Sequence, residues 1–521
     1  MRFAFVRPML AGFWACGLAA ASDAAEAADT ALTIYSHAGP GGVPVEAYSP
    51  AVMQGAQRQY GSPYGRELPG YAVVRQKRKM ELKEGVNTLR FKDVAAMIDP
   101  TTVSFESLTD PAGTRVIDQS YEFDLVSADK LLAKYIDRPI VITRSLGEGK
   151  IESLTATLLS YADGQMVLKT GDAANPILVA NRGNLINIEF GELPGGLITK
   201  PTLVWNLAAA RAGEHDIRVA YQTKSIVWWA DYNLILAGDE KTLEVGAWVS
   251  IINRSGASYE DATLKLVAGD VHRAPEARVE YDSGLNTSGV LTGADAQGFV
   301  EKPFFEYHLY TLGRPATIRD NSTQQIELFP PARQVPVEKV YVYYGLPENF
   351  RWYGRTAMVT DRDLGVQMNR KVDIYLRFEN RKEQNLGMPL PAGRIRVSKT
   401  DPADGSLEFI GEDVSDHTPK DEQVLVKMGS AFDVVGERRQ TDFRMDTSRR
   451  EMYESFEIKV RSHKEEAVTV LVKENLFRWA TWDIVKKNTD YEKVDHRTVH
   501  FPVRVKPDGE AVVTYTVKYT W

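Results

Sequence analysis

The sequence alternates apolar and polar residues along many of its segments, and this two-residue period constrains the fold more than any other feature. Near the end of the chain, Val513, Tyr515 and Val517 alternate with polar residues, and segments 371–378 and 456–461 follow the same pattern. Successive side chains of a β-strand point to opposite faces, so each segment predicts a strand with one buried and one solvated face. Antiparallel sandwiches are built from such strands. We therefore expect a mainly β protein made of several antiparallel, immunoglobulin-like β-sandwiches.

The length of the chain predicts more than one domain. It has 521 residues, whereas a single hydrophobic core usually stops growing at roughly 250–300 residues. A hydrophobic content of 43% is ordinary for a folded protein. The net charge of −7 argues against a nucleic-acid partner, which favours a basic surface. The single cysteine excludes a disulfide scaffold and a thiolate metal cluster.

The first 27 residues have the features of a secretory signal peptide. Arg2 and Arg7 precede a short apolar run at 9–21, and the small residues Ala25 and Ala27 follow in an A-x-A arrangement. We expect cleavage between residues 21 and 27, and a periplasmic or secreted mature protein without cysteine. No later segment is apolar enough to predict a transmembrane helix.

Turn residues and changes in composition divide the rest of the chain into five parts. A short helix is expected at 128–136, because Ser127 can cap its start and Pro139 stops it. Five short segments after Pro139 predict a small β-barrel-like unit of the SH3 or Sm kind; a meander that extends a neighbouring sheet is the alternative. The predicted parts are a flexible N-terminal arm at 28–70 with a short strand at 32–35, an N-terminal β region at 71–138 that ends in the helix, the small unit at 139–200, a first sandwich at 201–345 with a long loop at 273–300, and a C-terminal sandwich at 370–521.

Several motifs together resemble a known bacterial family. They include Trp228–Leu234, Ala247–Gly256, Pro389–Val397 and Gly429–Val434. The chain resembles the domain of unknown function 4139 (DUF4139) family over residues 200–521, and more loosely before them. The resemblance implies a mostly β envelope protein without an assigned activity. Many relatives have a coiled coil where this chain has the small unit. The resemblance implies no catalytic residue and no cofactor.

The densest polar run beside a histidine lies between Glu412 and Glu422. Such residues could perform acid–base catalysis or hold a metal. The alternative is a loop between two strands, with its carboxylates paired by nearby lysines and arginines. The chain has no His-Glu-x-x-His and no Gly-x-Ser-x-Gly motif. We predict no metal site and no cofactor. The weak catalytic candidates are His417, Glu412, Asp413, Asp421, Glu422 and Arg438.

Four aromatic residues form a candidate binding platform. Trp228, Trp229, Tyr232 and Trp248 lie on two neighbouring predicted strands. Aromatic rings can stack on sugars, but on alternating strands about half of these side chains must face the core. One outward-facing tryptophan is enough for a binding patch.

The sequence therefore predicts an exported envelope protein that acts as a non-enzymatic binding or structural module. Its expected partner is another envelope protein or a polysaccharide. Two alternatives remain open. One is a hydrolase or metal-dependent enzyme that uses the region between Glu412 and Glu422. The other is an outer-membrane β-barrel, because an alternating last strand that ends on Trp521 also suits such a barrel.

Overall fold

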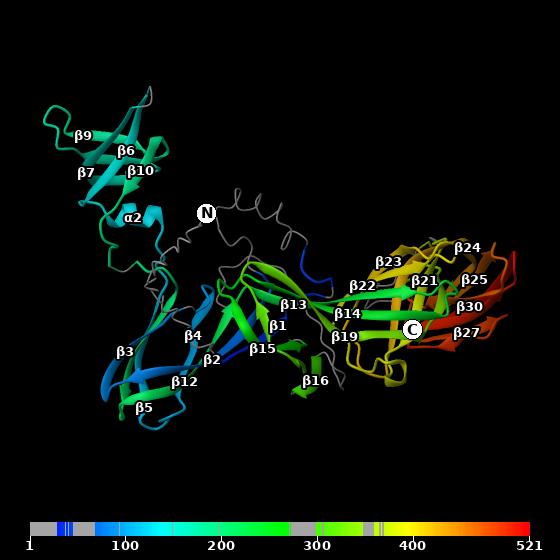
Figure 1. Ribbon diagram of the computed structural model, residues 1–521. Helices are drawn as coiled ribbons and strands as arrows, with labels where there is room; N and C mark the ends of the chain where they lie inside the picture. Colours follow the sequence, from blue (N-terminus) through cyan, green and yellow to red (C-terminus); the bar gives the residue numbers. More distant parts are fainter. Residues whose placement is uncertain are drawn as a thin grey trace, which may run out of the picture.

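The computed structural model describes residues 29–44, 68–271, 299–346 and 359–521, with short gaps at 37, 40, 93, 148–149, 196, 270, 305–306, 364–365 and 367–368. These residues are mostly β-strand and contain a single α-helix, which confirms the predicted mainly β class (Figure 1). None of their helices has the length and hydropathy needed to cross a bilayer. The predicted signal peptide lies outside the described residues, as does the predicted loop at 273–300 except for positions 299 and 300.

The N-terminal sheet has eight strands, and the segment at 29–36 forms one of its central strands. Its strands, in spatial order, are β16 (Phe299–Phe304), β17 (Tyr307–Leu312), β15 (Tyr259–Ala268), β1 (Asp29–Ser36), β2 (Gly70–Leu82), β12 (Gly213–Lys224) and β4 (Ile98–Ser107), with β18 (Ala316–Ile318) beside β15. β1 pairs parallel to β15 and antiparallel to β2. Leu32 and Ile34 are fully buried. Residues 29–36 thus form a strand that includes the one predicted at 32–35, but it lies in the centre of a sheet and not in a flexible arm, because its alternate apolar side chains complete the core.

The bridging sheet has five strands drawn from both predicted sandwiches. They are β19 (Ser322–Pro336), β14 (Thr242–Asn253), β13 (Ile226–Leu236), β22 (Gly393–Thr400) and β23 (Leu407–Ser415). The chain enters it from β12 through Ser225, a buried residue with φ of 59°. This single left-handed residue turns the chain out of one sheet and into the next.

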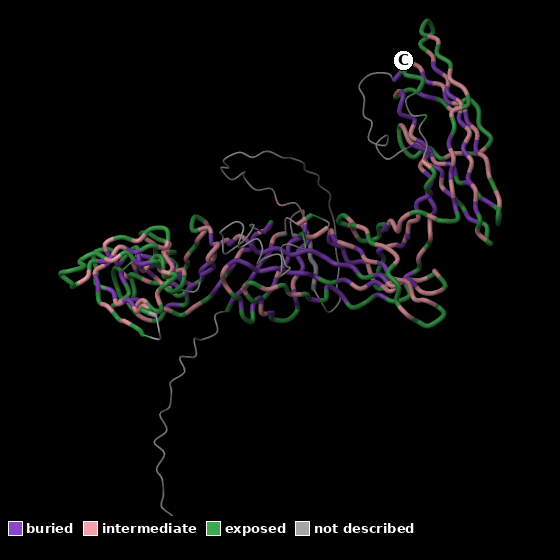
Figure 2. Tube along the Cα trace, turned by 90° about the horizontal axis from the view of Figure 1, so that it is seen from above, coloured by how far each residue is buried: buried purple, intermediate pink, exposed green. Residues whose placement is uncertain are grey.

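A three-stranded sheet completes the first sandwich-like block. It consists of β3 (Gly85–Lys92), β11 (Thr202–Ala209) and β5 (Thr114–Glu122). One hydrophobic core joins this sheet to the N-terminal and bridging sheets and includes Phe91, Trp205, Tyr221 and Trp228. In Figure 2, buried residues run along the middle of the tube, and exposed residues lie at its turns.

The small unit at 139–200 is an insertion between two strands of the three-stranded sheet. α2 (Ala128–Lys134) precedes it, with Ser127 Oγ accepting a hydrogen bond from the Lys130 N–H at 3.3 Å. Its sheet follows the order β10 (Leu185–Glu189), β6 (Pro139–Gly147), β7 (Lys150–Ala162), β8 (Gln165–Lys169) and β9 (Ile177–Asn181), all antiparallel. Leu132 and Tyr135 pack on its separate core. The unit stands apart from the other sheets in Figure 1.

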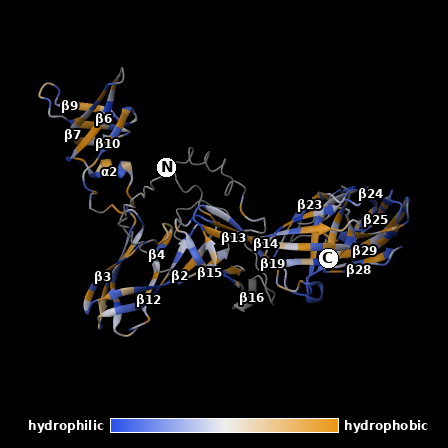
Figure 3. Cartoon of the chain, viewed as in Figure 1, coloured by the Kyte–Doolittle hydropathy of each residue, from blue (hydrophilic) through white to orange (hydrophobic). Residues whose placement is uncertain are grey.

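The C-terminal sheet has nine strands. In spatial order these are β27 (Trp482–Lys487), β30 (Gly509–Thr520), β25 (Glu451–Ser462), β24 (Gln423–Asp446), β21 (Lys371–Glu379), β20 (Glu338–Tyr344), β26 (Val468–Asn475), β29 (Thr498–Val505) and β28 (Glu492–Lys493). β29 also contacts β30, so the sheet curls and its two halves face each other. The rings of Phe456 and Phe501 pack on Tyr515 from opposite halves, at 5.3 and 5.4 Å between centroids. Alternating apolar and polar colours mark its strands in Figure 3.

The boundary between the two large predicted parts differs in the structure. β20 lies within predicted part 201–345 but pairs with β21 and β26 of the C-terminal sheet. β22 lies within predicted part 370–521 but pairs parallel to β13 of the bridging sheet. Each strand joins the sheet that completes its hydrogen bonds, and local alternation does not encode which sheet that is.

Candidate functional site on the bridging sheet

The two acidic candidates on β23 point to opposite faces of the bridging sheet, because Glu412 and Asp413 are consecutive in a strand. Glu412 approaches Arg396, with 3.8 Å between carboxylate oxygen and guanidinium nitrogen. Asp413 accepts hydrogen bonds from the backbone N–H groups of Lys427 (2.6 Å) and Val414 (2.9 Å). Asp413 therefore joins β23 to β24, while Glu412 belongs to the other surface.

The remaining catalytic candidates have separate roles. His417 Nδ1 accepts a hydrogen bond from the Ala392 N–H at 3.0 Å. The backbone of Asp421 and Glu422 is bonded to Asn380, a fully buried residue that organises this turn. Arg438 lies inside the C-terminal sheet, in an ion pair with Glu474. Apart from Asp421 and Glu422, which share the backbone of Asn380, these candidates contact different partners, and no group of three potential metal ligands occurs among the described residues.

The aromatic candidates divide by face, as alternation requires. Trp228 and Tyr232 lie in the main core, where the Tyr232 hydroxyl donates to the Pro391 carbonyl at 2.7 Å. Burial raises the pKa of Tyr232 well above its ordinary value, so it stays a neutral donor. Trp229 and Trp248 lie on the opposite, outer face; Trp229 is buried, and Trp248 is 38% exposed. Trp248 is therefore the accessible member of the predicted platform.

Strand register places polar residues in a row on both sides of Trp248. Its partner on β13 is Asp231, and its partner on β19 is Glu327. Directly opposite residues in an antiparallel pair share a face, with Cβ atoms about 4.5–5.5 Å apart. On the far side of Asp231 the row continues to Arg394 on β22. Trp248 is thus an aromatic residue with polar residues on both sides of it in the row.

A chain of polar contacts crosses this outer face. The Ser250 hydroxyl donates to Asp231 Oδ2 at 2.6 Å, and Gln325 Nε2 donates to Ser250 Oγ at 3.0 Å. Arg396 donates to the other oxygen of Asp231 at 3.3 Å and lies beside Glu412. The chain spans all five strands and fixes the side chains around the indole. We call this outer face, centred on Trp248 and Asp231, the Trp248 face.

Gly246 leaves room next to the indole. It lies two residues from Trp248 on the same face, opposite the exposed Asn233. A Cβ atom at Gly246 would meet only the Asn233 carbonyl oxygen, at an ordinary 3.6 Å. The space beside the Trp248 ring is therefore open, and Asn233 lies at its edge.

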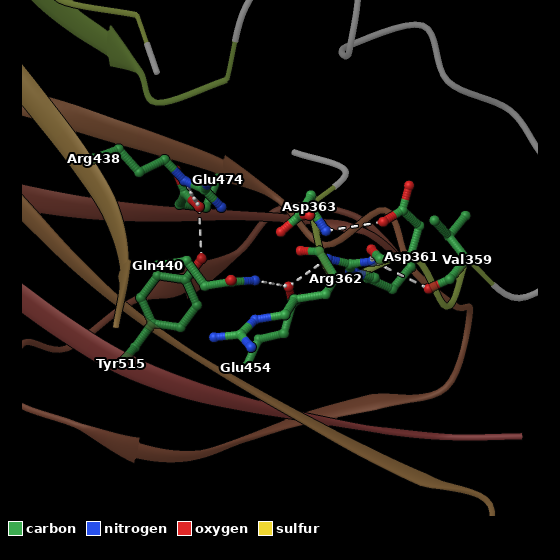
Figure 4. A network of polar contacts seen from close by, with 10 residues as sticks. Val359, Asp361, Arg362, Asp363, Arg438, Gln440, Glu454, Glu474 and Tyr515 are labelled. Atoms are coloured by element: carbon green, nitrogen blue, oxygen red, sulfur yellow. Dashed lines mark hydrogen bonds and ion pairs between the residues drawn. The ribbon is translucent and has the colours of Figure 1, made fainter. Parts of the chain in front are cut away.

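A second polar network lies inside the C-terminal sheet and is different in kind. Arg438 Nε contacts both carboxylate oxygens of Glu474 at 2.9 and 3.1 Å, and the Tyr515 hydroxyl donates to the same carboxylate at 2.5 Å. The Arg438 side chain is 2% exposed and that of Glu474 is 0% exposed. Figure 4 shows Arg438 and Glu474 facing each other. Coulombic attraction to Glu474 outweighs burial and raises the pKa of Arg438.

A second ion pair in the C-terminal sheet is equally buried. Arg478 donates to Glu454 at 2.7 Å, and Gln440 donates to the same oxygen at 2.8 Å. Arg478 also donates to the backbone carbonyls of Val359 and Asp361, which are both labelled in Figure 4. These groups are bonded to protein on most sides and offer little to a ligand, so we interpret the network as structural.

Sequence reasoning missed part of the Trp248 face. Asp231, Ser250 and Gln325 lie on three strands and are separated by up to 94 positions. Their contact depends on register across the sheet, which no local motif records. The apolar residues Ala247 and Val249 on either side of Trp248 are the signal in the sequence that could have assigned Trp248 to the outer face.

No protein-family model matches the chain, and no curated protein matches it. The resemblance noted from the motifs therefore remains a prediction.

Proposed function

We propose that this chain is an exported, non-enzymatic envelope protein that binds saccharide on the Trp248 face. The observation that carries the proposal is an indole that is 38% exposed and lies among hydrogen-bonded polar side chains on the outer face of a sheet. Pyranose rings present apolar C–H faces and a rim of hydroxyls, which match an aromatic ring surrounded by donors and acceptors. Membership of the DUF4139 family and periplasmic or secreted location are parts of the same proposal.

The charges around Trp248 favour an uncharged ligand. Asp231 and Arg396 are paired with each other, and Glu412 lies beside Arg396. The face therefore carries both signs side by side, without a single-sign patch that would attract a strongly charged partner. Asn233 and Glu327 supply further polar groups at its edges.

The test is a titration of the mature chain with N-acetylglucosamine hexamer and, separately, with cellohexaose, two uncharged oligosaccharides, followed by calorimetry. Trp248→Ala should weaken binding about tenfold or more, equivalent to ~1.4 kcal/mol. Phe432→Ala is the matched control, because Phe432 is a 95% exposed aromatic residue on the C-terminal sheet. Failure of both probes to bind, or equal affinity in Trp248→Ala and the parent, contradicts the proposal.

Location is tested separately. The full chain is expressed in a bacterial host, and the periplasmic fraction is examined by N-terminal sequencing. A mature protein that begins between residues 22 and 28 is expected. An intact chain that stays in the cytoplasm contradicts export.

A further inference from the structure

Trp229 lies close to Trp248 on the same face but is covered. Trp229 pairs with Ser250, and Trp248 pairs with Asp231, so the two indoles occupy diagonal positions on neighbouring strands. Diagonal residues on one face are about 7–8 Å apart, within reach of aromatic side chains. The two rings are therefore adjacent positions of one surface, and only one of them is open to solvent.

The cover over Trp229 is a glycine turn near the start of the chain. Gly42 has φ of 74°, and a Cβ atom there would lie 2.9 Å from Cδ1 and Nε1 of the Trp229 indole. Only a glycine backbone can approach the ring this closely in this conformation. Val43 joins Trp229 and Ile252 in a small buried cluster separate from the main core.

Two hydrogen bonds hold the backbone of this turn, beside the apolar packing of Val43. Arg394 donates to the Gly41 carbonyl at 2.9 Å, and the Gly42 N–H donates to the Gly39 carbonyl at 2.8 Å. Arg394 lies on β22 in the same row as Asp231 and Trp248. The side chain that holds the turn is therefore itself part of the Trp248 face.

We propose that Trp229 is a second saccharide subsite, occupied in this structure by residues 41–43 of the chain itself. A saccharide long enough to extend from Trp248 onto Trp229 displaces the turn, and Arg394 then donates to the saccharide instead of to Gly41. A short saccharide occupies Trp248 alone and leaves the turn in place. This inference rests on the proposed function and adds a selection by ligand length.

The experiment compares Gly42→Ala with Gly39→Ala in the mature chain. A methyl group at Gly42 collides with the Trp229 indole, whereas one at Gly39 in the same turn has nothing within 4 Å. Gly42→Ala should therefore uncover Trp229 and increase acrylamide quenching of tryptophan fluorescence, and Gly39→Ala should match the parent. Gly42→Ala should bind the N-acetylglucosamine hexamer at least three-fold more tightly, with unchanged affinity for the dimer.

A further variant shows which ring causes the gain. Adding Trp229→Ala to Gly42→Ala should remove the gain in affinity for the hexamer. Equal quenching in Gly42→Ala and Gly39→Ala overturns the covered position of Trp229. Increased quenching without a gain for the hexamer, or a gain that survives Trp229→Ala, overturns the second subsite. Trp248→Ala separates the two proposals. If Trp248→Ala loses binding and Gly42→Ala has no effect, saccharide binding at Trp248 is supported and only the second subsite at Trp229 is contradicted.

Discussion

The Trp248 face and the buried network of the C-terminal sheet use the same kinds of side chain for opposite purposes. Each contains an arginine–carboxylate pair, a glutamine and a hydroxyl group. On the Trp248 face, the Arg396 side chain is 40% exposed although its partner Asp231 is only 8% exposed; in the C-terminal sheet, Arg438 and Glu474 are both almost completely buried. The difference shows that burial, more than residue type, decides whether a polar cluster is available to a ligand.

The energetics of the two networks follow from this difference. Separating a buried ion pair leaves a charge without solvent or partner, which is far more costly than separating an exposed one. The C-terminal network should therefore govern stability and leave binding unchanged. The Trp248 face should govern binding and affect stability only moderately.

The largest expected effect comes from removing one buried charge. Glu474→Leu leaves Arg438 and the Tyr515 hydroxyl without their shared carboxylate, and should destabilise the C-terminal sheet by about 3–5 kcal/mol. Glu437→Leu is the matched control, because Glu437 pairs with the partly exposed Arg461 at 3.4 Å and should lose less than about 1 kcal/mol. Urea unfolding followed by fluorescence measures both. Similar losses in the two variants would contradict the distinction between the networks.

Replacing the whole polar group should reverse most of this loss. The triple variant Arg438→Met, Glu474→Leu, Tyr515→Phe keeps similar volumes and leaves no member of this group charged. Buried ion pairs can often be replaced by apolar residues with little loss, so we expect stability within about 1–2 kcal/mol of the parent. The same urea titration measures it. A triple variant as unstable as Glu474→Leu alone would show that the network contributes through more than charge pairing.

On the Trp248 face, Asp231→Ala should have an intermediate effect on stability. It leaves the buried Ser250 hydroxyl without its acceptor, at a cost of about 1–3 kcal/mol. Asp231→Asn retains an acceptor oxygen and should lose less. Both variants should weaken oligosaccharide binding in calorimetry, because the side chain that contacts both Ser250 and Arg396 on the Trp248 face is changed. If Asp231→Ala unfolds the chain as easily as Glu474→Leu does, the Trp248 face is a structural network as well.

The smallest effect concerns Glu240, which joins the two regions. Its carboxylate contacts Lys399 of the bridging sheet at 2.7 Å and Lys339 of the C-terminal sheet. Burial alone would raise the pKa of Glu240, but hydrogen bonds from Lys339 and Lys399 outweigh it and lower the pKa to about 2. A lowered folded pKa stabilises the protein above the unfolded value of about 4.3, and this contribution is lost as the pH falls from there toward 2.

Glu240→Gln tests this contribution. Because the carboxylate is partly exposed, the pH-dependent difference between parent and variant should be no more than about 1 kcal/mol per ion pair. Unfolding midpoints measured from pH 6 down to pH 2.5 should converge as the pH falls. Midpoints that stay equally far apart over this range would contradict a role for the carboxylate charge.

Local pattern predicted the elements well and their assembly less well. The strands at 371–379 and 509–520 follow visible alternation, and the cap at Ser127 marked the helix start. The central place of β1 was not predictable, because an eight-residue strand pairs with segments 34 and 223 positions farther along the chain. Such pairing depends on which sheet edges remain open when the rest of the chain has folded.

The sequence by itself determined the class of the protein and that the four aromatic candidates divide between two faces, because the two-residue period places neighbouring side chains on opposite faces. Only the tertiary structure decided which faces are covered. It placed β22 and β23 in the bridging sheet, set Asp231 beside Ser250 and Arg396, and laid Gly42 on Trp229. The physical reason is that alternation is a local property of a strand, whereas burial of a face depends on distant segments that pack against it.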